Sequence, residues 1–535
     1  MGKVERFART QFISRAPVLL PPQLRTAEPA TTPDDEVLRL PYYPGWRSQP
    51  TTVLSMLASF FRNAVFLLVL NLLVKGVYLF VIERTVQNIL PGGDYGLYFS
   101  LLGLGLILQV VADFGLQHYS MRTISGHRHL LAKDFPHFLG LKLLLGAAFC
   151  VLTFGAGVAL GYRGWQLGLL GLVSVAQFFN SLAIYLRSNL SGLGRYAYDS
   201  VFSVLDKLLM IVIVGGVLWL APGRLSISLF AGTQVLCWLL TAAGVWYSLR
   251  NRLTETRPRF RRSTLLLLLR GGAPFALAIL LQAAYTRTDA VMIERLLPDG
   301  AVAADHYAAG YRLLDALNTV GWLTAGLLLP MFARMHARRE SLRELLRFSL
   351  HFLVGGGIVA GILLAAYARP IVYLLYDFAE PRTAAILAFL MLSFVAQCLN
   401  YVYGALLGGT GLIGRMNWVF VGGLLLNFSA NWWVLPRYGA PGAAAVTLVT
   451  QSLIATVQAS LAHRWLPLAG SGIEWDKLIA LAGLVATVVI LTATLLDWWW
   501  AWQFLLVGAS AACLLFVLRL LLIRDIRNFL SRARQ

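Results

Sequence analysis

The chain has 535 residues, of which 58% are hydrophobic and 13% are charged, and its formal net charge is +20. Soluble domains carry about 25% charged residues, so this composition, with a mean hydropathy of +0.68, excludes an ordinary soluble domain and indicates a protein that crosses the membrane many times. Cytoplasmic loops and contact with anionic lipids explain the positive charge, so no nucleic-acid partner is expected.

The first 55 residues differ in kind from the rest of the chain. They contain eight prolines and no apolar run long enough to span a membrane. This composition predicts a disordered cytoplasmic tail and not a signal peptide. Whether the tail docks a partner or is an inert extension stays open.

Fourteen apolar runs follow, each close to the length of about 20 residues that a membrane-spanning helix needs. The predicted spans are 62–82, 96–117, 137–161, 164–187, 201–221, 226–249, 271–295, 307–333, 346–375, 384–408, 415–436, 440–464, 476–496 and 501–523. Of the 45 Lys and Arg residues, 33 fall on the side of the N-terminus, 7 on the opposite side and 5 within helices. The positive-inside rule therefore predicts that both termini are cytoplasmic.

The order of the spans predicts the domain organisation of an all-α integral membrane protein with about 14 transmembrane helices. Six helices in each half give the halves the same orientation, which predicts two pseudo-symmetric six-helix bundles around a central cavity, with an appended helix pair. The predicted segments are the tail (1–55), the N-terminal bundle (56–249), a basic cytoplasmic crossover (250–270), the C-terminal bundle (271–465), and the appended pair with a basic C-terminal tail (466–535).

Two matching segments, 75–98 and 287–315, support the duplication. When Glu83 is aligned with Glu294, an offset of 211 residues, Asp94 falls on Asp305. Both segments carry charge into an apolar helix. A duplicated bundle with charges at equivalent places is typical of a transporter whose site lies between its halves.

Three cations are predicted to lie within spans. At 1.5 Å per residue, Lys75 lies about 20 Å, Arg287 about 24 Å and Arg312 about 22 Å above the cytoplasmic end of the membrane core. A layer of cations at one depth can bind a phosphate or a carboxylate, and the arginine fork suits two phosphate oxygens. The alternative is structural pairing, between Arg312 and Asp315 at i,i+3 or between Arg287 and Asp289.

Other polar residues in the spans include candidates for a functional role that also have a structural interpretation. Asp113, Asp289 and Asp315 are the candidates for gating or ion coupling, although Asp113 could also cap its helix or pair with Arg122. Tyr285 and Tyr311 are candidates to stack on sugar rings, although buried tyrosines are commonly packing residues.

Lys142 and Lys207 are predicted to extend their ammonium groups to the membrane surface. The short external loops leave no room for a catalytic domain, and the sequence contains no GxxxxGK[ST] motif for ATP hydrolysis. The four cysteines lie in predicted spans without metal-ligand spacing. No catalytic residue, metal site or cofactor is therefore expected.

Several segments resemble the polysaccharide and oligosaccharide flippases of the multidrug/oligosaccharidyl-lipid/polysaccharide (MOP) exporter superfamily, and the resemblance covers roughly residues 60–465. They are Asn71 to Lys75, Pro91 to Gly96, Ala112 to Gly115, Pro274–Phe275, Arg287 to Asp289, Tyr307 to Asp315, and Pro370 to Tyr376. The fourteen predicted spans exceed the twelve of many O-antigen flippases and are similar in number to the lipid II flippase branch. The long proline-rich tail also departs from the common pattern.

The resemblance implies a multi-pass protein of the bacterial inner membrane that moves an undecaprenyl-diphosphate-linked oligosaccharide, a polysaccharide repeat unit, to the periplasmic face. The head group would enter a cationic cavity, with Arg287, Arg312 and Lys75 as the lining candidates, and the lipid tail would stay in the bilayer. Expected partners are the lipid-linked glycan, membrane lipids and the polysaccharide polymerase or export machinery. Three alternatives stay open: a cation-coupled multidrug exporter of the same superfamily, an integral-membrane glycan polymerase or glycosyltransferase, and a scaffold for glycan assembly.

Overall fold

The structure is a computed structural model that describes residues 71, 73–116, 129–193, 195–250, 257–259, 262–468 and 472–520. The chain divides into two units, Met1–Leu54 and Ser55–Gln535, and all the described residues belong to the second. The predicted disordered tail therefore lies outside the described residues. The described regular structure is entirely helical, which confirms the all-α prediction.

The N-terminal half begins with a helix that contains Lys75 and continues through the π-helix η1 (Tyr78–Glu83) into α2 (Arg84–Ile89). The remaining elements of this half are α3 (Asp94–Asp113), α5 (His129–Ala159), α6 (Trp165–Gly192), α7 (Tyr196–Leu220), the 3-10 helix η2 (Pro222–Arg224) and α8 (Ile227–Arg250). A π-helix widens one turn of a helix and is often found at functional sites, and here it ends at Glu83.

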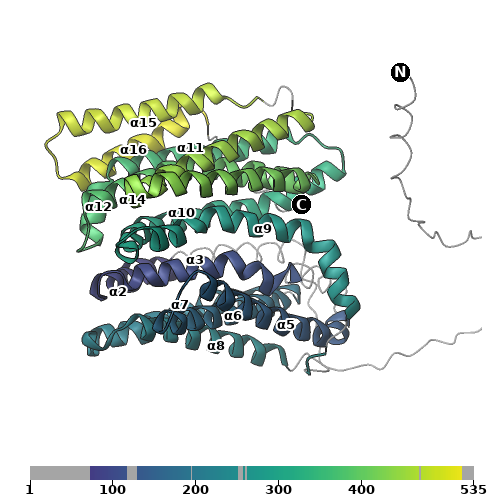
Figure 1. Ribbon diagram of the computed structural model, residues 1–535. Helices are drawn as coiled ribbons and strands as arrows, with labels where there is room; N and C mark the ends of the chain where they lie inside the picture. The colour runs from purple at the N-terminus through teal and green to yellow at the C-terminus, as the bar shows by residue number, and fades with distance from the viewer. Residues whose placement is uncertain are drawn as a thin grey trace, which may run out of the picture. The chain divides into compact units, whose positions relative to one another are not determined.

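The C-terminal half repeats the helical pattern, and two further helices follow it. The half consists of α9 (Arg262–Leu296), α10 (Gly300–Ala337), α11 (Arg343–Ala366), α12 (Ala368–Leu375), α13 (Pro381–Gly409) and α14 (Ile413–Trp465). The appended pair is α15 (Trp475–Leu495) and α16 (Trp500–Val517), which packs against α11 (Figure 1).

Eleven of the described helices are long and apolar enough to cross a membrane. They account for twelve of the fourteen predicted spans, because α14 comprises the eleventh and the twelfth, which meet at Gly439, where the φ of 61° is not helical. The seventh predicted span lies in α9, and about half of the first lies outside the described residues. One prediction was wrong in detail: the span predicted over 346–375 is interrupted at Tyr367, where α11 ends and α12 begins.

The two halves meet where α3 packs against α9 and α10, and Figure 1 shows α3 between those helices and the rest of the N-terminal half. The backbones approach closely at Gly96, where an added Cβ would lie 2.0 Å from the carbonyl oxygen of Ala301. The amide of Gly93, in the left-handed region with φ 95°, donates a hydrogen bond of 2.6 Å to Oδ2 of Asp305. The two segments that match in sequence therefore contact each other across the boundary between the halves.

Candidate functional site

An ion pair between Arg312 and Glu83 joins the two halves within the membrane-spanning region. Nη2 of Arg312, on α10, lies 2.8 Å from Oε1 of Glu83, at the end of η1, with angles outside those of a hydrogen bond. Tyr95 connects the same two side chains, because its hydroxyl donates to Glu83 at 2.7 Å and accepts from Nε of Arg312 at 2.9 Å. The guanidinium also lies 5.2 Å from the ring centroid of Phe99. Three residues of the N-terminal half thus hold one cation of the C-terminal half.

A second pair continues the network on the C-terminal side. Arg287, on α9, donates two hydrogen bonds to the carboxylate of Asp315, at 2.9 and 3.2 Å. Asp315 also lies 4.0 Å from Nη1 of Arg312, and the ring of Tyr311 lies under the guanidinium of Arg287, 4.8 Å away. We call Glu83, Arg312, Asp315 and Arg287 the inter-half network. It holds two arginines and two carboxylates, so its formal charges cancel.

Exposure is lowest at the Glu83 end of the inter-half network and highest at Asp315. The side chain of Glu83 is 6% exposed, that of Arg312 13%, that of Arg287 20% and that of Asp315 27%. Buried charges of this kind are tolerated only when they are paired. Because α10 runs inward from Gly300 in the predicted orientation, Asp315 lies deeper than Arg312. The inter-half network is therefore least accessible at Glu83, and most accessible at Asp315, which lies deeper in the membrane in the predicted orientation.

Several further contacts close the boundary near Glu83. Arg84 donates to the carbonyl oxygens of Leu375 and Leu374, and Asn88 donates to Leu375 at 3.1 Å. The side-chain amide of Gln87 donates to the carbonyl oxygen of Asp305 at 3.0 Å. These residues lie at the ends of helices that the distribution of basic residues predicts to be external. The two halves are therefore bonded to each other at that end of the bundle.

Lys75 does not join the two arginines. Its side chain is exposed, and the charged groups that act on it are Lys207, Asp206 and Arg187, all in the N-terminal half. Lys207 itself lies 4.2 Å from the ring centroid of Tyr78 and 3.4 Å from Asp206. The three cations therefore have different partners in this structure, and a common layer that binds one head group stays a prediction.

Asp113 and Lys142 form a pair that sequence reasoning missed. Nζ of Lys142 donates to Oδ1 of Asp113 at 2.9 Å, to the carbonyl oxygen of Ala112 at 2.9 Å and to Oγ of Ser181 at 2.7 Å. The lysine side chain is fully buried, so the expected extension to the membrane surface is wrong. All three ammonium protons have acceptors, which explains how α3, α5 and α6 can hold the charge inside one half.

Asp289 is a fully buried carboxylate that no cation neutralises among the described residues. Oδ2 accepts hydrogen bonds from the hydroxyls of Tyr307, at 3.0 Å, and Thr447, and Oδ1 accepts from Nδ2 of Asn431 at 2.8 Å. The side chain of Asn427 lies next to Asn431. The expected pairing of Asp289 with Arg287 is therefore wrong, because Asp315 takes that arginine and Asp289 faces only neutral donors.

The two candidate tyrosines are both buried. Tyr285 packs against Phe420, with ring centroids 5.7 Å apart, and Tyr311 donates to the carbonyl oxygen of Thr286 at 2.8 Å. Tyr311 also covers Arg287, as described above. In this conformation their rings support the site from within the protein. Their predicted contact with sugar rings stays a prediction.

No group of three or more His, Cys, Asp and Glu side chains within the described ranges is arranged to hold a metal ion. The residues that could hold a ligand are therefore the arginines of the inter-half network for an anion, and the oxygen atoms around Asp289 for a small cation.

Together, the fold and the inter-half network define a polytopic α-helical membrane protein of the transporter type, with buried charge between two repeated bundles. The sequence profile of the family described as "Polysaccharide biosynthesis protein" matches residues 60–336, more than half of the chain. The chain belongs to this family, within the MOP superfamily. Among curated proteins, none matches the chain.

The fold is similar to that of several solved structures. The lipid II flippase MurJ in an inward closed conformation aligns with a TM-score of 0.65 at 14% identity, over 86% of this chain and 99% of MurJ. An inward-facing multidrug resistance MATE family transporter of the MOP superfamily aligns with a TM-score of 0.56 at 16% identity, over 72% of this chain and 93% of that one. A MATE transporter of Vibrio cholerae, VcmN in the bent form, gives 0.51 at 15% identity, over 77% and 97%. At these identities the similarity concerns the fold, and it confirms the predicted architecture.

Proposed function

We propose that the protein is a flippase that moves an undecaprenyl-diphosphate-linked oligosaccharide across the bacterial inner membrane by alternating access. Family membership supports a role in polysaccharide biosynthesis. The observation that carries the proposal is the inter-half network, in which two arginines at the boundary of the halves are held by carboxylates that a diphosphate can replace. The proposed transport units are the bundles 56–249 and 271–465, with both termini cytoplasmic.

The proposed first step is an exchange of anions. A diphosphate approaching the more exposed end of the network accepts hydrogen bonds from Arg287 and Arg312, because guanidinium forks bind phosphate oxygens in pairs. Asp315 and Glu83 then lose their cations. Lys75, exposed on the N-terminal half, is a further candidate to meet the head group.

The second step follows from the position of Glu83. The ion pair of Glu83 with Arg312 connects the two halves at the end of the bundle where hydrogen bonds also join them. A substrate that binds Arg312 therefore weakens the contact that keeps this end closed. A ligand shifts a conformational equilibrium by its differential affinity for the two states, and couplings of about 1–3 kcal/mol are typical. Binding of the head group from the inside would thus promote opening toward the outside.

Asp289 is the proposed coupling site. A buried carboxylate surrounded by neutral hydroxyl and amide groups can take up a proton or a monovalent cation, because either would neutralise a charge that is costly to bury. It lies between α9, α10 and α14, so its occupancy can alter the packing of the C-terminal half. Asp113, which already has a cation partner, is a weaker candidate for this role.

We further propose that the protein acts as a transporter without catalytic activity or cofactor, and that a polysaccharide polymerase or export complex uses its product. The alternative is a cation-coupled multidrug exporter with the same fold. No observation on the described residues favours a glycan polymerase or glycosyltransferase.

The test is transport by purified protein in liposomes that contain a fluorescent polyprenyl-diphosphate oligosaccharide. Translocation is measured as the fraction of glycan that an external glycosidase can reach. Each of Arg312→Gln and Arg287→Gln removes charge-assisted hydrogen bonds of about 1.5–3 kcal/mol each, so we expect transport to fall at least about tenfold.

The matched control is Arg369→Gln, which removes an exposed arginine of α12 that forms no described ion pair. It should transport at the wild-type rate. Wild-type transport by stably inserted Arg312→Gln and Arg287→Gln proteins would refute the anion site. Extrusion of cationic dyes without movement of the glycan lipid would instead identify a drug exporter.

A further inference from the structure

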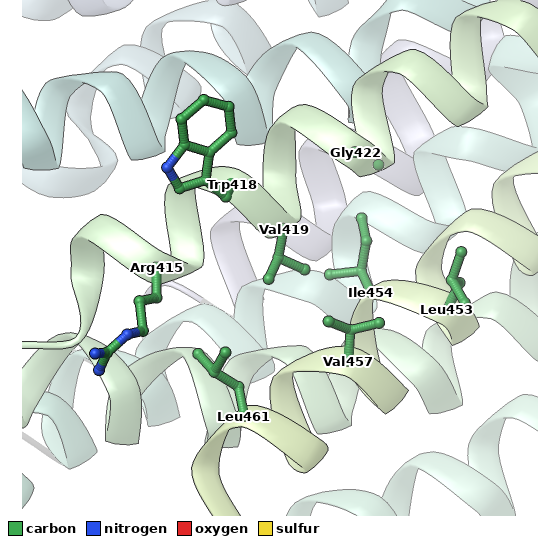
Figure 2. Close-up of a pocket in the computed structure, with 9 residues that line it drawn as sticks. Arg415, Trp418, Val419, Gly422, Leu453, Ile454, Val457 and Leu461 are labelled. Atoms are coloured by element: carbon green, nitrogen blue, oxygen red, sulfur yellow. The ribbon is translucent and has the colours of Figure 1, made fainter. Parts of the chain in front are cut away.

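An apolar groove lies between the two limbs of α14, outside the inter-half network. It has a volume of about 490 Å³ and is lined by Arg415, Trp418, Val419, Gly422, Gly423, Leu453, Ile454, Val457 and Leu461. Figure 2 shows Arg415 at one end and Leu453 toward the other. From Arg415 to Gly423, and likewise from Leu453 to Leu461, eight residues at 1.5 Å each give a length of about 12 Å. Both limbs therefore line the groove over the same distance.

Two neighbouring glycines shape this groove in different ways. A Cβ on Gly423 would lie 2.5 Å from Cδ1 of Ile454, so this glycine lets the two limbs approach closely. A Cβ on Gly422 would meet nothing within 4 Å, so its missing side chain leaves open space beside that contact. The walls are Leu, Ile and Val side chains, and Trp418 is 77% exposed at the edge. Because α14 crosses the membrane, an apolar chain can enter the groove directly from the bilayer.

Arg415 gives one end of the groove a positive charge. Its guanidinium lies 3.5 Å from the ring centroid of Trp465, and it forms no ion pair with a carboxylate in the described part of the chain. The stacking fixes the plane of the guanidinium, while its N–H donors at the edge stay able to bind an anion. His463 and Arg464 in the last turn of α14 add basic groups at the same end. The distribution of basic residues predicts that this end faces the cytoplasm, where anionic lipids give the membrane surface a negative potential.

We propose that this groove binds one anionic phospholipid, with an acyl chain between the limbs of α14 and the phosphate on Arg415. The apolar walls fit a hydrocarbon chain, and the unpaired cation at the cytoplasmic end fits a phosphate that carries a net negative charge. A zwitterionic lipid of equal chain length fills the same walls but brings its own cation toward Arg415. The site therefore selects lipids by head-group charge.

The experiment is native mass spectrometry of delipidated protein titrated with phosphatidylglycerol or with phosphatidylcholine of identical acyl chains. We expect the first phosphatidylglycerol to bind about tenfold more tightly than phosphatidylcholine, a difference of about 1.4 kcal/mol, because the choline group brings a second cation toward Arg415. Arg415→Gln should remove this preference. Gly422→Leu should fill the groove and weaken the first binding step for both lipids.

The controls are Arg437→Gln, an exposed arginine near Trp433 farther along α14, and Gly483→Leu, at an open position on α15. Both should bind the two lipids as the wild type does, and thermal unfolding without added lipid should show that all four variants are folded. Retention of the preference by Arg415→Gln, or unchanged binding by Gly422→Leu, would overturn the proposal. Displacement of phosphatidylglycerol by undecaprenyl phosphate at lower concentrations would also overturn it, and would identify a polyprenyl chain as the occupant.

Discussion

Lys142 and Arg312 are both cations inside the protein that pair with a carboxylate, yet only Lys142 lies in the same half as its partner. Lys142 is fully buried, and its partners, Asp113 and Ser181, belong to the same half. Arg312 is 13% exposed, and its main partner Glu83 belongs to the opposite half. An ion pair inside one bundle can persist while the bundles move, whereas a pair across the boundary must break when they separate. The comparison indicates a structural role for Lys142 and a switching role for Arg312.

The largest effect is expected at Lys142. Lys142→Met leaves the carboxylate of Asp113 without its cation, and breaking a buried pair in this way costs about 3–5 kcal/mol. We expect a large drop in the thermal unfolding temperature of the purified protein. Lys142→Met combined with Asp113→Leu removes both charges and should recover most of the loss. A stable single variant would contradict the structural role.

Asp289 sharpens the comparison, because it is buried within one half and pairs with none of the cations that the structure describes. Asp289→Asn keeps the shape but removes the charge that a proton or cation would neutralise. We expect transport in liposomes to lose its dependence on the ion gradient. Under a gradient, the transport rate of the variant should be about tenfold below that of the wild type, equivalent to about 1.4 kcal/mol. The control is Thr319→Val, which removes a hydroxyl that donates a hydrogen bond to the backbone carbonyl oxygen of Asp315. Its transport should keep the dependence on the ion gradient. Unaltered gradient dependence in Asp289→Asn would exclude it as the coupling site.

Glu83→Gln tests the switching role directly. The substitution keeps the size of the side chain but removes its charge, which weakens the contact between the halves by about 1.5–3 kcal/mol, the range for a hydrogen bond to a charged group. We expect faster hydrogen exchange in 91–96 and 300–306, where the two segments meet, without a large change in unfolding temperature. Glu340→Gln, which removes an exposed acid that pairs with Arg338, should leave exchange in these segments unchanged. Equal exchange in Glu83→Gln and wild type would show that Glu83 does not hold the boundary.

Lys75 should give the smallest effect. It lies apart from the inter-half network, and an exposed charge contributes at most about 1 kcal/mol. We expect Lys75→Gln to lower glycan transport by less than about fivefold, compared with the larger loss for Arg312→Gln in the same liposomes. A loss as large as that of Arg312→Gln would show that Lys75 moves to the head group during transport.

Most of the predicted spans were confirmed in the described part of the chain, because a span depends on local composition. A run of about 20 apolar residues must cross the bilayer as a helix, whatever surrounds it. The break at Tyr367, inside a predicted span, shows the limit of this reasoning. Helix ends inside an apolar stretch depend on neighbouring packing, and apolarity alone does not fix them.

The candidate site was predictable in part. Arg287, Arg312 and Asp315 were identified because charge within a span is costly and needs an explanation. Spacing of i,i+3 indicated a pair between Arg312 and Asp315, and these groups do lie 4.0 Å apart. Glu83 was visible in the repeat but was not recognised as the partner of Arg312. No local signal connects residues 229 positions apart.

The sequence by itself determined that this is a polytopic, duplicated membrane protein with cations in its spans, because length, hydropathy and charge act through each segment separately. Only the tertiary structure decided that Asp315 pairs with Arg287, that Glu83 pairs with Arg312, and that none of the described cations pairs with Asp289. Pairing energies fall off with distance and depend on burial, so the choice among several acids and cations at similar depth is made by how the helices pack.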